Sequence, residues 1–164
     1  MDPSSLTDSL RHYFATQSPA GTVAAFLFGS HARGTPHADS DVDVAVLLDH
    51  AAYRALDDPL DLRARLGSAL IHVTGNDRVD VVLMNEASPP LNKAILDEGC
   101  SLVVRHEAAL TEFRLVTYSR AFDLQPWLDR WRREQMRRVA GAHGHTSAAT
   151  GTRSGASPRS QSPP

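Results

Sequence analysis

The segment of residues 29–43 constrains this chain more than any other part of its sequence, because it joins two strongly apolar runs. It begins with Gly-Ser and ends, after ten intervening residues, with Asp-Val-Asp. The run before it, residues 22–28, and the run that starts with its last three residues, 41–48, have the length and apolar content of buried strands. We therefore expect two strands whose connection carries a tight turn at one end and two carboxylates at the other.

Gly29 and Ser30 are suited to binding phosphate. Glycine allows a close approach of the backbone because it has no Cβ, and serine adds a hydroxyl donor. Where a helix begins directly after a strand, successive backbone N–H groups converge and favour an anion. The pair is therefore a candidate seat for a triphosphate, although an ordinary strand-to-helix turn with serine as its cap has the same sequence.

Asp41 and Asp43 point to a cation. Side chains at positions i and i+2 of a strand lie on the same face, so the two carboxylates repel each other. Along residues 41–48 the odd-numbered positions therefore share one face of the predicted strand, and the even-numbered positions share the other. Magnesium favours hard oxygen ligands, typically one or two carboxylates together with phosphate and water. A solvated strand end, or a capping role for Asp41, is the alternative.

Asp80 is the candidate for a third carboxylate, because it interrupts the apolar run of residues 79–84. A helical stretch predicted within residues 51–73, with a break near residues 57–59, can return the chain so that this strand lies beside the strand at 41–48. Asp80 would then complete a site for two metal ions and act as the base on an incoming hydroxyl. An acid on an exposed edge strand is the alternative.

The whole chain alternates between helical and strand patterns, which predicts an α/β (α+β) fold with a small mixed sheet of about four strands. Further helices are expected at 4–17, 89–98 and 107–139, with a break at Pro126, and further strands at 79–84 and 101–105. We divide the chain into an α/β domain at 1–105, a helical segment at 106–139 and a disordered tail at 140–164, where few residues are large and apolar.

Composition excludes several classes of protein. The formal net charge of −2 argues against a surface that coats nucleic acid. A single cysteine, Cys100, cannot form an intramolecular disulfide or a multi-cysteine zinc site. No apolar run reaches the length of a signal peptide or a membrane span, so a cytoplasmic protein without membrane contact is expected.

The sequence from Gly29 to Leu48, GSHARGTPHADSDVDVAVLL, resembles the minimal nucleotidyltransferases of the DNA polymerase β-like superfamily. The shared pattern is Gly-Ser, ten residues, Asp-x-Asp, and a third acid on a later strand; the resemblance covers about residues 10 to 105. It implies that Gly29 and Ser30 bind the triphosphate of ATP.

The resemblance also implies two Mg²⁺ ions, bound by the three aspartates, with Asp80 on the catalytic metal. Arg33 falls within the family's Gly-Ser-x-Ala-Arg-Gly pattern, where it contacts phosphate or forms an ion pair with a nearby acid. Ser40 belongs to the nucleotide-binding set and fixes the loop before Asp41.

Small members of this family resemble antitoxins that are paired with a HEPN-domain RNase toxin, which they silence by adding AMP to a tyrosine. The resemblance therefore implies a protein adenylyltransferase with a HEPN partner. An antitoxin that acts by contact alone, through residues 107–139, and an enzyme that modifies a small molecule such as an aminoglycoside are the alternatives. Trp127 and Trp131, four residues apart on the predicted helix, suit either a protein interface or packing on the chain's own domain.

Overall fold

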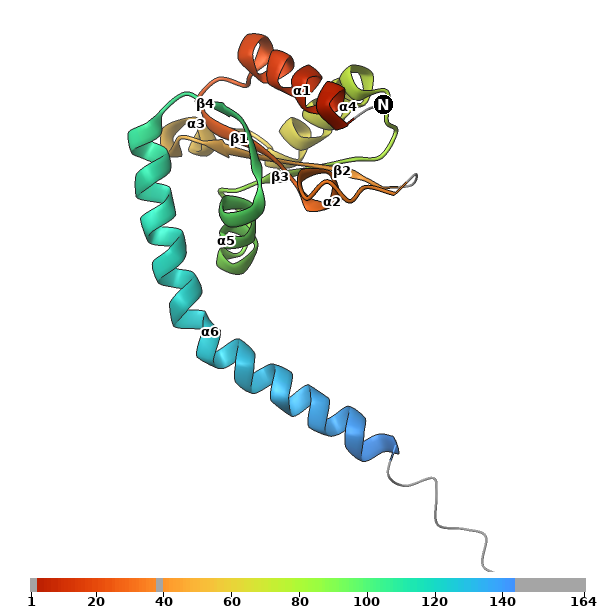
Figure 1. Ribbon diagram of the computed structural model, residues 1–164. Coiled ribbons are helices and arrows are strands. Elements are labelled where there is room, and N and C mark those ends of the chain that lie inside the picture. The colour runs from red at the N-terminus through yellow and green to blue at the C-terminus, as the bar shows by residue number, and fades with distance from the viewer. Residues whose placement is uncertain (1–2, 38–39, 144–164) are drawn as a thin grey trace, which may run out of the picture. The chain divides into compact units, whose positions relative to one another are not determined.

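The computed structural model describes residues 3–37 and 40–143, except that the side chains of residues 3, 4, 125, 127–129 and 131–143 are not described. Four strands form one mixed sheet in the order β3-β2-β1-β4 (Figure 1). The strands are listed here with their bounds: β1 (Thr22–Phe28), β2 (Val42–Leu48), β3 (Val79–Leu83) and β4 (Cys100–Val104). The predicted fold class and number of strands are confirmed.

Strand direction follows from the connections. β1 pairs with β2 and with β4 in antiparallel fashion, whereas β2 and β3 are parallel. A parallel pair needs a long crossover, and here it consists of the helices α3 (His50–Arg54) and α4 (Pro59–Thr74). The side chain of Asp58 accepts a hydrogen bond from the Leu60 N–H at the start of α4, and Pro59 follows as its first residue. The predicted break before Pro59 is therefore confirmed.

The two faces of the sheet carry separate cores, and α1 (Pro3–Gln17) and α4 cover one of them (Figure 1). The other face packs against α5 (Pro89–Glu98) and the beginning of α6 (Glu107–His143). β2 alternates between these cores as its pattern predicts. Val44 and Val46 lie in the first core, and Ala45 and Leu47 in the second.

The C-terminal helix differs from the prediction in two respects. α6 is a single helix with Pro126 inside it, so the predicted break at Pro126 is wrong. Proline removes one backbone donor and crowds the preceding turn, but helix-favouring residues on both sides continue the helix. α6 also ends at His143 rather than at 139, because Ala140 and Ala142 favour helix. The first four residues of the predicted disordered tail are therefore helical.

The unit that contains the sheet extends to Asp123, so the first turns of α6 belong to it, and a second unit begins at Leu124. The predicted division between a domain at 1–105 and a helical segment at 106–139 stays a prediction. The rest of the predicted tail, residues 144–164, and the side chains of Trp127 and Trp131 lie outside the described residues. Among the residues that are described, no helix combines the length and the hydropathy that crossing a membrane requires.

Arg105 anchors the end of α1 to the sheet. Its Nη2 donates to the carbonyl oxygens of Phe14, at 3.0 Å, and Ala15, at 2.9 Å. Carbonyl groups in the last turn of a helix receive no hydrogen bond from the helix itself, so a donor from elsewhere in the chain has to satisfy them.

We expect Arg105→Ala to lower the free energy of unfolding by about 1–2 kcal/mol, because two helix-end carbonyls lose their charged donor. Urea denaturation measures this change. Arg114→Ala is the matched control, since the ion pair of Arg114 with Glu107 is long, at 3.8 Å, and lies at the surface. That control should change the same free energy by less than about 0.5 kcal/mol. Equal losses in the two variants would contradict the anchoring role.

Candidate active site

Three aspartates gather where β2 and β3 begin. The two strands are parallel and in register, with Asp43 directly opposite Asp80. Paired residues of neighbouring strands project from the same face of a sheet, so these two carboxylates are neighbours. Asp41 precedes β2 by one residue, which corrects the predicted start of the strand at that residue. The structure therefore brings the three predicted acids to one end of the sheet.

Gly29 joins the predicted phosphate turn to these acids. The preceding residue, Phe28 on β1, is paired with Asp43 on β2. The Gly-Ser turn and the Asp-x-Asp motif, which are ten residues apart in the sequence, therefore lie side by side. Gly29 has a φ of +71°, and a Cβ at this position would overlap Oδ2 of Asp43 and lie 2.9 Å from its Cγ. Only glycine allows the backbone to turn this close to the carboxylate. The following helix α2 (Gly29–Ala32) carries Ser30.

The Asp43 carboxylate is in an environment that disfavours its charge. Its pKa is raised above the ordinary 3.8, first by burial, then by the negative charges of Asp80 and Asp41, while His31 and Arg33 oppose the shift. Desolvation and like charges both penalise the ionised form. A cation between these groups would reverse that penalty, which agrees with the magnesium hypothesis.

The donor set fits a cation that is shared with phosphate. In the described part of the chain, no three Asp, Glu, His or Cys side chains are close enough to bind one ion by themselves. A complete protein cage for a metal is therefore not formed by these residues. Magnesium does not need one, because it usually binds to one or two carboxylates together with substrate phosphates and water. Asp43, whose pKa is raised and which has Asp80 and Asp41 as neighbours, would be the central carboxylate of such a site.

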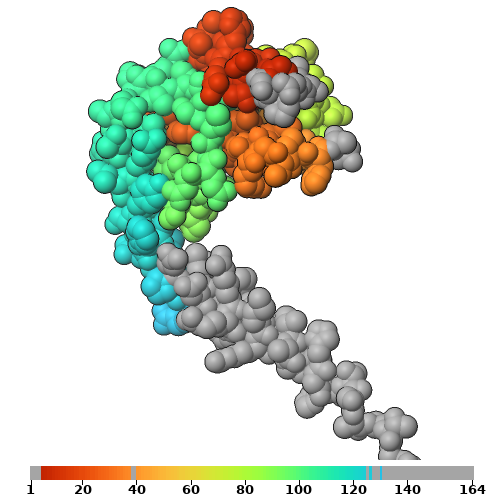
Figure 2. All heavy atoms as spheres, viewed as in Figure 1, coloured from red at the N-terminus to blue at the C-terminus, as the bar shows by residue number. Residues whose placement is uncertain are grey.

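Arg33 lies at the rim of the site and forms an ion pair. Its Nη1 is 3.4 Å from Oε2 of Glu98 on α5, and both side chains are about half exposed. The ion pair is one of the two roles predicted for Arg33. Figure 2 shows the segment around α2, in orange, on the surface beside α5, in green. An exposed pair of this kind contributes little to stability, so Arg33 can exchange Glu98 for a phosphate at small cost.

Ser40 is engaged by its own loop. Its Oγ accepts a 2.8 Å hydrogen bond from the backbone N–H of His37, and its N–H donates to the His37 carbonyl at 3.0 Å. These bonds agree with the predicted role in fixing the loop. A contact between Ser40 and a nucleotide stays a prediction.

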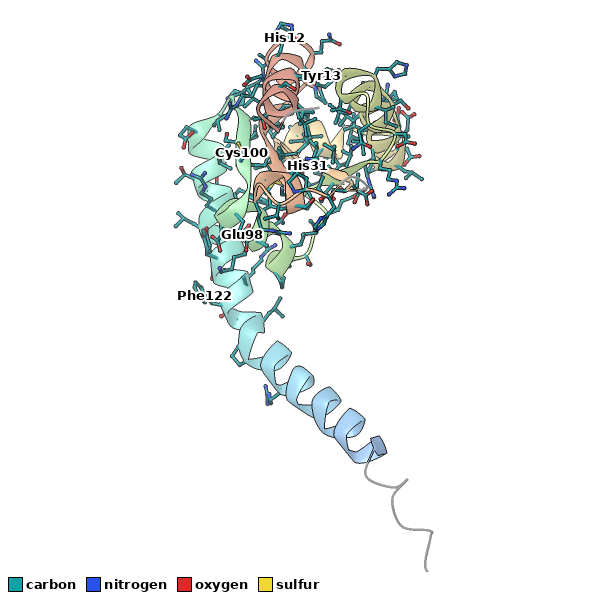
Figure 3. All side chains as sticks on the ribbon, turned by 45° about the vertical axis from the view of Figure 1, so that its right-hand side comes forward. His12, Tyr13, His31, Glu98, Cys100 and Phe122 are labelled. Carbon is teal, nitrogen blue, oxygen red and sulfur yellow. The ribbon has the colours of Figure 1, made fainter. Side chains whose placement is uncertain are left out.

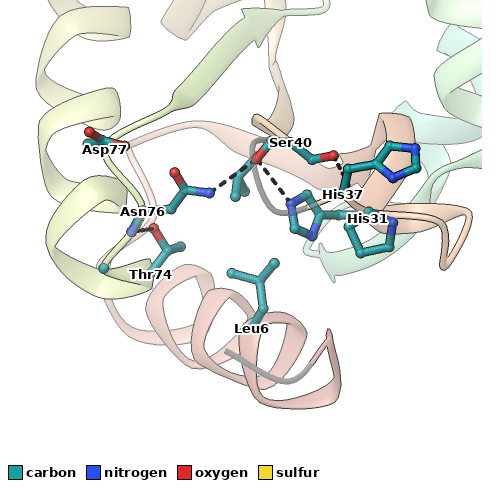
Figure 4. Close-up of a pocket in the computed structure, with 10 residues that line it drawn as sticks. Leu6, His31, His37, Ser40, Thr74, Asn76 and Asp77 are labelled. Carbon is teal, nitrogen blue, oxygen red and sulfur yellow. Dashed lines mark hydrogen bonds between the residues drawn. The ribbon is translucent and has the colours of Figure 1, made fainter.

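Sequence reasoning missed Asn76, which reaches the site loop from the turn between α4 and β3. Its Nδ2 donates to the Ser40 carbonyl at 3.3 Å, 36 residues away in sequence (Figure 4). The stretch of residues 74–77 indicates only a turn, and nothing in its composition identifies a distant partner. Covariation of the two positions among homologues is the signal that would have found this contact.

Comparisons with known proteins show which family the chain matches. Residues 9–108 match the family model described as "Polymerase beta, Nucleotidyltransferase". No curated protein matches the chain significantly. A chain from a crystal structure of a toxin–antitoxin with AMP-PNP is 26% identical, with a TM-score of 0.63, over 83% of this chain and 99% of that chain.

A second solved structure contains the tri-AMPylated Shewanella oneidensis HEPN toxin in complex with MNT antitoxin. It is 22% identical, with a TM-score of 0.61, over 79% of this chain and 98% of that chain, and shows the similarity of fold alone. The family model, in contrast, spans more than half of the 164 residues and includes all the candidate site residues. The chain therefore belongs to the polymerase beta nucleotidyltransferase family and is a nucleotidyltransferase.

Proposed function

We propose that this nucleotidyltransferase transfers AMP from ATP to the hydroxyl group of a tyrosine in a HEPN-type toxin, and that it thereby neutralises the toxin as its antitoxin. The observation that carries the proposal is the contact of the Gly29 turn with the Asp43 carboxylate, directly beside Asp80. Through this contact, the proposed phosphate-binding turn adjoins the proposed cation-binding carboxylates. The similar structure of a toxin–antitoxin with AMP-PNP supports the choice of nucleotide and of a toxin as the acceptor.

In this mechanism the residues of the chain divide between substrate binding and proton transfer. Gly29 and Ser30 bind the triphosphate of ATP, and Arg33 leaves Glu98 to contact it. Asp80, whose side chain is exposed, accepts the proton of the acceptor hydroxyl. The hydroxyl oxygen forms a bond to the α-phosphorus while the bond from that phosphorus to the bridging oxygen breaks, and pyrophosphate leaves.

Asp41 and Asp43 would hold two magnesium ions together with the phosphates of ATP and water, and Asp80 would join them as a further ligand of the catalytic ion once the nucleotide is bound. When bound, these ions neutralise charge on the phosphates and align the nucleophile with the leaving group. The raised pKa of Asp43 supports this assignment, because a cation relieves the repulsion among the three acids. We place the reaction in the cytoplasm, where ATP is available.

A protein acceptor is favoured by the exposed surface of α6. Leu115 and Phe122, seven residues apart and hence on one side of the helix, are 69% and 60% exposed. Phe122 projects away from the helix (Figure 3). Large apolar side chains that cluster at a surface are typical of interaction sites.

Coexpression with a HEPN-type partner encoded by a neighbouring gene tests the proposed function. Intact-mass analysis of the partner should show gains of whole AMP units, and these gains should disappear with the double variant Asp41→Ala, Asp43→Ala. If that variant neutralises the toxin without any mass gain, the protein acts by contact alone. If the wild type instead modifies an aminoglycoside and protects cells that lack the partner, the acceptor is a small molecule.

A further inference from the structure

The two peptide groups that flank Asp41 are both held by the turn that leads into β3. On one side, the Val42 N–H donates to the Arg78 carbonyl at 2.9 Å. On the other side, the Ser40 carbonyl accepts the 3.3 Å bond from Nδ2 of Asn76 (Figure 4). With both neighbouring peptide planes fixed, the direction in which the Asp41 side chain leaves the backbone is fixed as well.

The orientation of Asn76 is itself determined by its surroundings. Its Oδ1 accepts a 2.9 Å hydrogen bond from the Arg78 N–H, and its own N–H donates to Oγ1 of Thr74 at 3.2 Å. Because Oδ1 must be the acceptor within this turn, the other end of the amide is necessarily the donor. Asn76 is therefore a rigid two-ended link between the turn before β3 and the loop before β2.

His31 approaches the same carbonyl from the opposite side. Its Nε2 lies 3.5 Å from the Ser40 oxygen, so it is a longer and weaker second contact. His31, Ser40 and Asn76 all line a cavity of about 500 Å³ on the side of the sheet covered by α1 (Figure 4). Asn76 thus acts on Asp41 from behind the strand, away from the face that carries Asp43 and Asp80.

We propose that Asn76 is a positioning residue, which holds Asp41 in the orientation that binds a divalent cation together with the nucleotide triphosphate. The role rests on the proposed function, in which Asp41 is a metal ligand. Asn76 acts only through the backbone of Ser40. Its loss should therefore weaken cation binding without removing any ligand.

Two variants separate the parts of the link. Asn76→Asp retains an oxygen that accepts the Arg78 N–H but replaces the donor with an oxygen that repels the Ser40 carbonyl. Asn76→Ala removes both ends. Asn85→Ala is the matched control, since Asn85 bonds the N–H and the carbonyl of Leu48, at 3.0 and 2.9 Å, at the other end of β2.

Calorimetric titration of Mn²⁺ into each full-length protein saturated with AMP-PNP measures the effect. Both Asn76 variants should bind Mn²⁺ about five- to tenfold more weakly than the wild type, the loss expected for one hydrogen bond. Asn85→Ala should lower the thermal midpoint and leave the Mn²⁺ affinity unchanged. Wild-type affinity in the Asn76 variants, or an equal loss in Asn85→Ala, would overturn the positioning role. If the wild type binds Mn²⁺ no better than Asp43→Ala does, the proposed function fails, and this role fails with it.

Discussion

Asp43→Asn is expected to slow AMP transfer by at least about 10³-fold, because it removes the central carboxylate of a site that stabilises transition-state charge by several kcal/mol. The same change should make the protein more stable when metal is removed by a chelator. Asp43 is partly buried and faces the negative charges of Asp80 and Asp41, both of which raise its pKa. An amide of the same shape has no charge to repel.

The gain in stability should depend on pH in a defined direction. Because the pKa of Asp43 is raised in the folded state, the folded protein binds a proton more tightly than the unfolded chain does. At a pH above the raised pKa, the charge on Asp43 lowers the free energy of unfolding of the wild type by its full amount. This loss disappears as the pH falls to the ordinary carboxyl pKa of 3.8. The free energy of unfolding of Asp43→Asn should therefore exceed that of the wild type most at neutral pH and least in acid.

Thermal unfolding in chelator at several pH values measures this difference. At neutral pH we expect a gain of about 1 kcal/mol, or about 2–4 °C in the midpoint for a chain of this size. Asp61→Asn is the control, because Asp61 forms an exposed 2.9 Å ion pair with Arg65 on α4. It should leave transfer unchanged and lower stability slightly. A less stable Asp43→Asn protein would mean that the carboxylates do not repel one another in the folded state.

The positions of the three acids were predictable because they depend on simple regularities. Alternation along residues 41–48 predicted which side chains of β2 face each core. The helical stretch between β2 and Asp80 predicted that the strand carrying Asp80 lies beside β2. Both predictions are confirmed by the parallel register of Asp43 and Asp80.

Features that depend on distant contacts were not predictable from the sequence. The bond from Asn76 to Ser40 exists because the crossover places one turn behind another, and an asparagine in a turn has the same local pattern whether or not such a partner exists. The sequence also could not decide whether Arg33 pairs with an acid or contacts phosphate, because its partner Glu98 lies far away along the chain. At Pro126 the strong local signal was misleading, because a helix can continue past one lost hydrogen bond.

Among substitutions that add a single methyl group to the candidate active site, Gly29→Ala should cause the largest loss of stability and of AMP transfer. The new Cβ would overlap the Asp43 carboxylate, and the backbone would keep a φ of +71°, which alanine disfavours. The strained φ alone costs about 1–2 kcal/mol. Displacement of the carboxylate adds to that cost and should slow AMP transfer by about 100-fold, since an error of about 1 Å in a catalytic group has this effect.

Gly34→Ala separates the two contributions. Gly34 has nearly the same φ, +70°, but a Cβ there would meet no atom within 4 Å. It should therefore show the cost of the backbone alone, about 1 kcal/mol in urea denaturation, and retain transfer within a few-fold. If the two alanine variants are equally destabilised, the Asp43 carboxylate does not fill the space over Gly29.

A double-mutant cycle with Asp43→Ala identifies the group that the new methyl meets. In the Asp43→Ala background, the oxygens and the Cγ that crowd Gly29 are absent, and only a Cβ at an ordinary 3.4 Å remains. Gly29→Ala should then cost no more than Gly34→Ala does. The coupling free energy should reach at least about 1 kcal/mol, which is typical of residues in direct contact. Additive effects would place the clash elsewhere, and the phosphate turn and the cation site would then have to be regarded as separate features rather than as one packed unit.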